Sequence, residues 1–166
     1  MSKEIYQFEI STYKSESELD QSDRELLTQA HEAASHAYAP YSHFKVGAAV
    51  RLNNGVIVTG NNQENAAYPS GLCAERVALF FANSKYPESA PVALAITAIS
   101  EKTPISEPIT PCGSCRQVMA EYEKKGGKDL RVIMRGQEGP VLITHSMKVL
   151  LPFSFADDLL LKYISK

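Results

Sequence analysis

Apolar residues at helical spacing follow an acidic and polar stretch near the start of the chain. Ser22-Asp23-Arg24-Glu25 has the spacing of a capping box, in which a serine hydroxyl and a later glutamate satisfy free amides at a helix start. The apolar positions that follow recur on one helical face, and they are Leu26, Leu27, Ala30, Ala33, Ala34 and Ala37. The pattern predicts a helix that begins near residue 22 and is ended by Pro40.

The next segments alternate between apolar and polar positions, as strands do. Residues 44–52 alternate in this way, Asn54-Gly55 predicts a tight turn, and residues 56–59 return as the second strand of a hairpin. Residues 92–99 are apolar almost throughout, which is typical of a strand covered on both faces.

Helices and strands also alternate in the rest of the chain. One helix is predicted to begin near Cys73, and another follows Pro111 and ends at Gly126-Gly127. Residues 130–134 and 141–144 predict two more strands, and a short helix is expected after Phe155. Since hairpins lie at the beginning and near the end, the pattern predicts an α/β fold, a three-layer α/β/α sandwich around a mixed sheet of about five strands.

Residues 1–21 are predicted to be an N-terminal extension, and residues 22–166 a single catalytic domain. Ile5, Phe8 and Ile10 are apolar, so the first part of the extension could be an added strand or a loosely docked arm, and a weakly ordered arm that packs locally, without catalytic role, is favoured. The chain has 166 residues, which suits one domain with a sizeable core. No internal repeat or interdomain linker interrupts it.

Composition and charge limit the classes of binding partner and the cellular compartment to be expected for this protein. A net charge of −2 and a pI of about 6.1 give no indication of a nucleic-acid-binding surface. The first residues lack the apolar core of a signal peptide, and no apolar run approaches the length that spans a membrane. Three cysteines, an odd number, do not suggest a disulfide framework, so a cytoplasmic location without a membrane or nucleic-acid partner is expected.

All three cysteines fall into one pattern, with Cys73 in Cys73-Ala74-Glu75-Arg76 and the others in Pro111-Cys112-Gly113-Ser114-Cys115-Arg116. Three thiolates suit zinc and leave a fourth position free for water, for which Glu75 is a proton acceptor. Cys112 and Cys115 project from one face of a helical turn, and Pro111 favours a helix start there. Both ligand clusters are therefore expected at helix N-termini, where thiolates are stabilised.

Several segments resemble the cytidine deaminase family. Residues 37–49 are similar to its N-terminal motif, residues 62–69 to its ribose-binding loop, and residues 150–155 to its C-terminal aromatic segment. The cysteine segments are similar to its zinc motifs, a signature known for zinc deaminases with Cys in the His position. The resemblance runs from about Ser22 to Leu161, and all-cysteine ligation is similar to the small, homotetrameric subgroup of this cytidine/deoxycytidylate deaminase family.

The resemblance implies one Zn²⁺ per subunit and hydrolytic deamination of cytidine and 2′-deoxycytidine to uridine and 2′-deoxyuridine, as in pyrimidine salvage. Glu75 is the expected proton shuttle, and Arg76 is expected either to donate hydrogen bonds to sulfur or to form a surface salt bridge. Asn62 and Glu64 are expected to bind the ribose hydroxyls, with a turn that bonds its own backbone as the alternative.

The remaining contacts that the resemblance implies concern the base and a neighbouring subunit. Phe44 would pack against the pyrimidine face, or else in the core, while the Ala74 amide and the Pro111 carbonyl would bind base edges. Tyr41, Tyr68 and Phe155 would complete the pocket across a subunit boundary, which requires a homo-oligomer.

The chain departs from the family at Gln63, where Val or Ile is usual, and at Asn61, where Cys is frequent. Gln63 bears on the sugar preference, whereas the metal chemistry is untouched. The N-terminal extension is also longer than usual.

Three alternatives remain open. The same chemistry could act on a nucleoside-like antibiotic such as blasticidin, although Asn62 and Glu64 favour a free ribose. A non-enzymatic zinc module would need a fourth protein ligand, for which His43 and His145 are the candidates. A dithiol redox protein that uses Cys112 and Cys115 would leave the remaining pattern unexplained.

Overall fold

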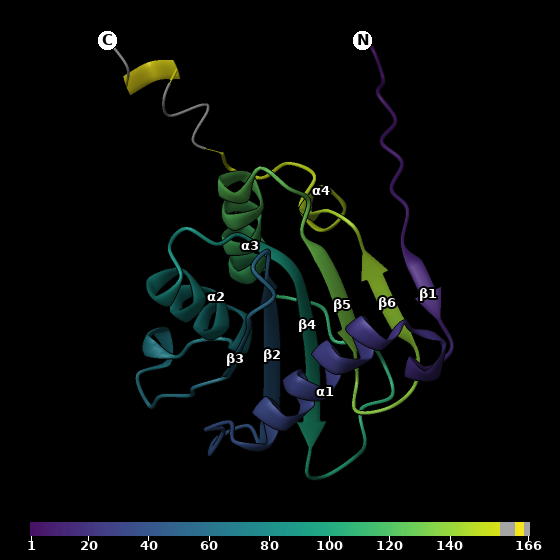
Figure 1. Cartoon of the computed structure of the whole chain (residues 1–166), viewed down its shortest axis with the longest axis vertical. Helices are drawn as coiled ribbons and strands as arrows, with labels where there is room; N and C mark the ends of the chain where they lie inside the picture. Colours follow the sequence, from purple (N-terminus) through teal and green to yellow (C-terminus); the bar gives the residue numbers. More distant parts are fainter. Residues whose placement is uncertain (157–161, 165–166) are drawn as a thin grey trace.

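The computed structural model of the chain describes residues 1–156 and 162–164 and contains one mixed sheet with helices on both faces (Figure 1). The described strands are β1 Ser11–Tyr13, β2 Phe44–Leu52, β3 Ile57–Asn61, β4 Pro91–Ser100, β5 Arg131–Arg135 and β6 Val141–Thr144. Their order across the sheet is β1-β6-β5-β4-β2-β3. The β4–β5 pair is parallel, and the other neighbours are antiparallel.

The helices form the two outer layers. Helix α1 (Gln21–Ser35) packs on one face of the sheet, and α2 (Ala74–Lys85) and α3 (Gly113–Gly126) pack on the other. The short α4 (Met147–Leu150) follows β6 and lies against α3. The predicted three-layer α/β/α sandwich is therefore confirmed, with six strands described instead of about five.

Each face of the sheet buries its own core because successive side chains of a strand point to opposite faces. In β4, Leu94 and Ile96 pack in the core under α2 and α3, whereas Ala93 and Ala95 pack in the core under α1. This central strand is covered on both faces, as its nearly continuous apolar sequence predicts.

The sixth strand comes from the N-terminal extension. Residues 11–13 pair antiparallel with β6, so that Ser11 lies opposite Ile143 and Tyr13 opposite Val141. Tyr13 packs against the α1 core, and Leu19 is buried in it. The expected weakly ordered arm is thus wrong for these residues: they form an added strand, because the open edge of β6 offers backbone groups that need partners.

The start of α1 also differs from the prediction. Asp20, not Ser22, is the N-cap, and its carboxylate accepts a hydrogen bond of 2.8 Å from the Asp23 amide. The Ser22 hydroxyl accepts instead from Arg51 Nη1 at 2.6 Å. The helix ends at Ser35, before Pro40 is reached. Ser22 thus makes a long-range contact in place of the local cap that its spacing predicts.

The hairpin of β2 and β3 turns at Asn54-Gly55 as predicted, with Gly55 at a φ of 84°. Further along β3, Gly60 lets α2 approach the sheet closely. A Cβ atom at Gly60 would lie only 2.5 Å from the Ala78 backbone nitrogen of α2. A glycine is therefore required where β3 meets the helix that carries Glu75.

The C-terminal segment is described only in part. Residues 162–164 are helical, and the rest of the short helix expected after Phe155, together with the Leu161 limit of the resemblance, lies outside the described residues. Helix α4 was not predicted, although Ser146 supplies its N-cap hydroxyl. Among the described residues, the helices are too short or too polar to cross a membrane.

Candidate functional site

The three thiols lie at the N-termini of two neighbouring helices. Cys73 is the N-cap residue of α2, Cys112 is the N-cap residue of α3, and Cys115 lies in the first turn of α3. This is the placement that the sequence predicts. The free amides and the positive end of the helix dipole at these positions stabilise thiolates.

The spacing of the sulfur atoms suits a tetrahedral metal. The Sγ atoms of Cys73 and Cys112 are 3.8 Å apart, and those of Cys112 and Cys115 are 3.4 Å apart. Thiolates that bind one zinc ion tetrahedrally at about 2.3 Å lie about 3.8 Å from each other. All three thiols are free, and all three ligand atoms lie within 4.8 Å of one another. The donor set therefore fits zinc.

The structure gives no support to a fourth protein ligand. Across residues 1–156 and 162–164, the group found able to hold a metal consists of the three cysteines alone. His43 faces Glu101, with 3.8 Å between Nδ1 and Oε2, and His145 faces Arg131, with 3.0 Å between Nδ1 and Nη1. Both proposed histidine ligands thus point to other partners, which argues against a closed structural zinc site.

Glu75 is the second residue of α2 and is almost fully buried, with 4% of its surface exposed. Burial raises the pKa of its carboxyl above the ordinary value of 4.5, because desolvation disfavours the charged form. A buried carboxyl with a raised pKa, next to a metal site and lining a pocket, is suited to accept and return a proton.

Arg76 lies where it can donate to sulfur. Its Nη2 atom is 3.8 Å from Cys73 Sγ, and its buried Nε atom has no hydrogen-bond partner among the described residues. The pKa of Cys73 is lowered to about 5, first by a hydrogen bond from Cys115 and then by Arg76. The contact matches the predicted donation to sulfur and not the alternative of a surface salt bridge.

A pocket of about 770 Å³ opens beside the thiols. It brings Tyr41, Phe44, Asn62, Glu64 and Tyr68 together with Glu75, as well as with Cys73, Cys112 and Arg76. Segments far apart in the sequence thus meet at one cavity that is large enough for a small organic ligand.

The two polar residues of the predicted ribose loop already have partners within the chain. Asn62 Oδ1 accepts from the Val46 amide at 2.7 Å, and Asn62 Nδ2 donates to the Phe44 carbonyl at 3.0 Å. Glu64 Oε2 accepts from the Tyr41 amide at 2.9 Å and from the Ser42 amide at 3.2 Å. These bonds shape the wall of the pocket. They are bonds to the chain's own backbone, which the sequence analysis gave as the alternative to ribose binding.

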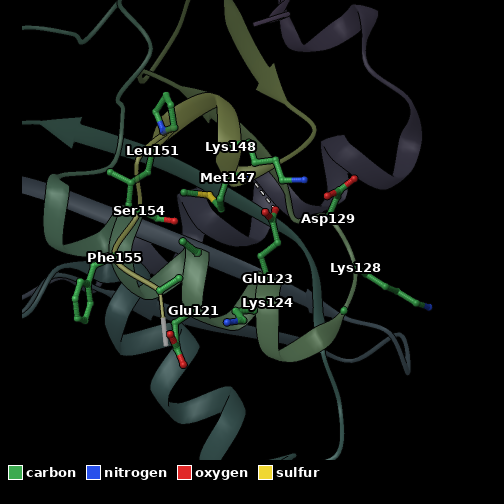
Figure 2. Close-up of a pocket in the computed structure, with 14 residues that line it drawn as sticks. Glu121, Glu123, Lys124, Lys128, Asp129, Met147, Lys148, Leu151, Ser154 and Phe155 are labelled. Carbon is green, nitrogen blue, oxygen red and sulfur yellow. Dashed lines mark hydrogen bonds between the residues drawn. The ribbon is translucent and has the colours of Figure 1, made fainter. Parts of the chain in front are cut away.

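Phe155 does not lie in this pocket. It lines a second cavity, of about 750 Å³, beside α3, as Figure 2 shows. Gln117 Nε2 donates to the Phe155 carbonyl at 2.7 Å and holds the segment there. Within one chain, Phe155 therefore cannot complete the pocket beside Glu75, because α3 holds its segment elsewhere. Its expected role across a subunit boundary stays a prediction.

The backbone groups expected to bind base edges flank the thiols. Ala74 is the fully buried first residue of α2, and the Pro111 carbonyl accepts a 2.8 Å hydrogen bond from Arg116 Nε. Neither residue lines the pocket itself. Ser42 and Thr110 do line it, although the sequence analysis assigned neither a role: Ser42 lies within the N-terminal motif of residues 37–49, and Thr110 directly precedes the second cysteine motif.

The family follows from a match over more than half of the chain. Residues 20–126 match the cytidine and deoxycytidylate deaminase zinc-binding region. The chain belongs to this family. It is therefore a zinc-binding deaminase, a hydrolase that acts on carbon–nitrogen bonds, and the predicted family, enzyme class and zinc cofactor are confirmed.

Known members of the family are similar in sequence and in structure. The cytidine deaminase of Halalkalibacterium halodurans is 46% identical to this deaminase over 100 residues, 60% of this chain and 71% of the relative. The crystal structure of cytidine deaminase from Burkholderia pseudomallei has a TM-score of 0.68 and 41% identity, and the match covers 82% of this chain and all of that one. Cytidine deaminase from Mycobacterium tuberculosis has a TM-score of 0.64 and 34% identity, over 82% and 99% of the two chains.

Proposed function

We propose that the protein catalyses the hydrolytic deamination of cytidine and 2′-deoxycytidine to uridine and 2′-deoxyuridine. The observation that carries this proposal is the buried Glu75 next to a three-thiol cluster, on the wall of a pocket of about 770 Å³. The similar proteins of known structure that are named cytidine deaminases support the choice of base.

The metal would be held by Cys73, Cys112 and Cys115. When bound, zinc supplies a Lewis acid that lowers the pKa of a coordinated water to about 7. Glu75 would carry the two protons that the water gives up, one to N3 of the cytosine ring and the other to the departing amino group, while the water oxygen would become the new carbonyl oxygen. One water is consumed and one ammonia leaves, so the carboxyl ends each cycle in its starting state.

Arg76 adjusts the charge of the site. Three thiolates around a doubly charged cation leave one net negative charge, which weakens the cation as a Lewis acid. The guanidinium of Arg76 donates toward Cys73 sulfur at 3.8 Å and withdraws electron density from it. Such partners of metal ligands are typically worth 10- to 100-fold in activity or metal affinity.

The nucleoside would lie between the β2 start and the loop after β3. Phe44 packs against the pyrimidine face, and the Ala74 amide and Pro111 carbonyl bind the base edges. Asn62 hydrogen-bonds the ribose hydroxyls, and the Glu64 carboxylate accepts hydrogen bonds from them. The Glu64 carboxylate already accepts hydrogen bonds from the Tyr41 and Ser42 amides. A ribose hydroxyl must therefore either donate to the same carboxylate beside these amides or displace them.

The protein would act as a homotetramer in the cytoplasm, in pyrimidine salvage. Tyr41, Tyr68 and Phe155 are 51%, 78% and 61% exposed, so they are free to meet a second copy. A reducing compartment would keep the three thiols available as ligands.

The test follows the ultraviolet absorbance of cytidine and of 2′-deoxycytidine with wild type, Glu75→Ala and Arg76→Gln, with zinc measured in each protein. Wild type should consume both nucleosides, and Glu75→Ala should retain zinc but lose about 10²- to 10⁴-fold in rate. Arg76→Gln should lose about 10- to 100-fold in kcat or zinc affinity. A zinc-loaded wild type that leaves both nucleosides intact but consumes blasticidin would overturn the substrate assignment.

A further inference from the structure

The turn that leads into the pocket is held in an unusual backbone conformation. His43 has a φ of 56°, and among the described residues no other residue except glycine has a positive φ. Side chains with a Cβ rarely adopt this left-handed region, and such residues persist where the surroundings hold them, often at functional sites. The neighbours of His43 in sequence, Ser42 and Phe44, both line the pocket.

One side of this turn is held by the loop after β3. The Glu64 carboxylate accepts from the Tyr41 and Ser42 amides, and it also accepts from the Ser42 hydroxyl. The Ser42 Oγ atom in turn accepts from the Phe44 amide at 3.0 Å. These bonds fix the residues before Phe44 but do not reach the residue after it.

The other side is held by Glu101, which directly follows β4. Its Oε1 atom is 2.9 Å from Lys45 Nζ, and its Oε2 atom is 3.8 Å from His43 Nδ1. The strand register places Phe44 opposite Ser100. Since side chains alternate along a strand, Phe44 and Val46 reach the pocket while Lys45 lies on the opposite face. Glu101 thus contacts His43 and Lys45, the residues before and after Phe44, from the side of the sheet opposite the pocket.

We propose that Glu101 is a positioning residue, which holds the turn of residues 41–45 so that Phe44 is presented to the nucleobase. This inference rests on the proposed function, because it is the cytosine ring that Phe44 would contact. Lys45 and His43 also keep the pKa of Glu101 below its usual range, with the hydrogen bond from Lys45 as the main cause. The carboxylate therefore stays charged at neutral pH.

Loss of this charge should weaken substrate binding without changing the chemical step. In Glu101→Gln, Lys45 and His43 lose their carboxylate partner, and the turn samples conformations in which Phe44 leaves the pocket wall. KM for cytidine should rise about two- to fivefold, the scale of an exposed ion pair, with kcat nearly unchanged. Glu75 and the three thiols are distant in sequence and unaltered.

The matched control is Glu107→Gln, which removes the same charge from an exposed glutamate farther along the same loop. It should leave KM unchanged. Exchange of the two charges, Lys45→Glu with Glu101→Lys, should return KM toward that of wild type, whereas Lys45→Glu alone should raise it. Equal KM values for Glu101→Gln and Glu107→Gln would overturn the proposal.

A measurement without substrate separates this proposal from the proposed function. Amide hydrogen exchange of residues 41–46 should be faster in Glu101→Gln than in wild type, with no change in α3. If wild type fails to turn over cytidine but exchange still responds, the substrate assignment fails and the restraint by Glu101 stands. Unchanged exchange would overturn the restraint, and faster exchange with unchanged KM in an active enzyme would overturn its role in binding.

Discussion

The carboxylate of Glu64 has three hydrogen-bond donors although its surroundings are solvent-exposed. The Ser42 hydroxyl, followed by the Tyr41 amide, lowers the pKa of Glu64 below the ordinary value of 4.5. These donors bind the charged form better than the protonated form. At the scale of a single residue, the ionised Glu64 carboxylate therefore stabilises the conformation of the turn that borders the pocket.

This gives a prediction for the dependence of stability on pH. Because the pKa of Glu64 is lower in the folded chain, its contribution is fully present above 4.5 and is lost as pH falls through the folded value. Wild type should exceed Glu64→Gln in free energy of unfolding at pH 7, and the difference should shrink toward pH 3. Urea unfolding at both pH values measures it, with Glu107→Gln as the control for charge. A difference that does not change with pH would refute the role of these donors.

At the scale of elements, an ion pair joins the start of α1 to the start of β5. Arg131 Nη2 lies 2.6 Å from Asp23 Oδ2, and Arg131 Nε lies 3.1 Å from the same oxygen. The Asp23 side chain is 5% exposed and that of Arg131 is 26% exposed. Since the two residues are 108 positions apart, the pair fixes the helix on the sheet over a long span of chain.

Loss of the acidic partner should be strongly destabilising. Asp23→Ala leaves the Arg131 guanidinium half-buried without its carboxylate, and the free energy of unfolding should fall by about 3 kcal/mol, the lower end for broken buried pairs. Glu25→Ala, on the same helix, removes the 60% exposed partner of Arg51 and should cost less than about 1 kcal/mol. Urea denaturation compares the two, and equal losses would contradict the importance of burial.

Local sequence signals predict those parts of the structure that depend on neighbours in the chain. The Asn54-Gly55 turn and the thiols at two helix N-termini were predicted, because both depend on spacing of a few residues. Strand β1 was not favoured, since only the open edge of β6 makes it form. The capping box predicted at Ser22 is not formed, and the Ser22 hydroxyl accepts instead from Arg51, 29 residues away.

The same distinction holds in the candidate site. The metal ligands and Glu75 could be predicted because they lie in two short sequence motifs. Glu101 could not be predicted, because its contact with Lys45 depends on how β2 pairs with β4. The place of Phe155 on the outside of α3 likewise depends on tertiary packing, here on its bond with Gln117.

At the scale of the whole molecule, the aromatic side chains near the two cavities face outward. Tyr41 and Tyr68 contact each other edge to face, with ring centroids 6.4 Å apart, at the pocket that contains Glu75. Phe155 lies at the other cavity (Figure 2). If two copies associate, Phe155 of one chain can complete the pocket of the other.

Mixing of subunits tests this arrangement. Phe155→Ala and Glu75→Ala should each have low activity, for different reasons. After the two are unfolded together and refolded with zinc, some pockets combine an intact Glu75 with the Phe155 of the other chain. Cytidine turnover by the mixture should therefore exceed the sum of the separately refolded variants. Activity equal to that sum, from an oligomer shown to contain both variants, would contradict a shared pocket.

The thiol cluster has a consequence for the lifetime of the protein in the presence of proteases. Cys73 and Cys112 are 39 residues apart and begin different helices, so a bound ion closes a long loop in the manner of a cross-link. Unlike a disulfide, this cross-link is lost when a chelator removes the ion or acid protonates the sulfurs. Zinc starvation would then free the ends of α2 and α3 and expose the chain to proteases, so that metal supply would govern how much of the enzyme a cell retains as well as how fast it works.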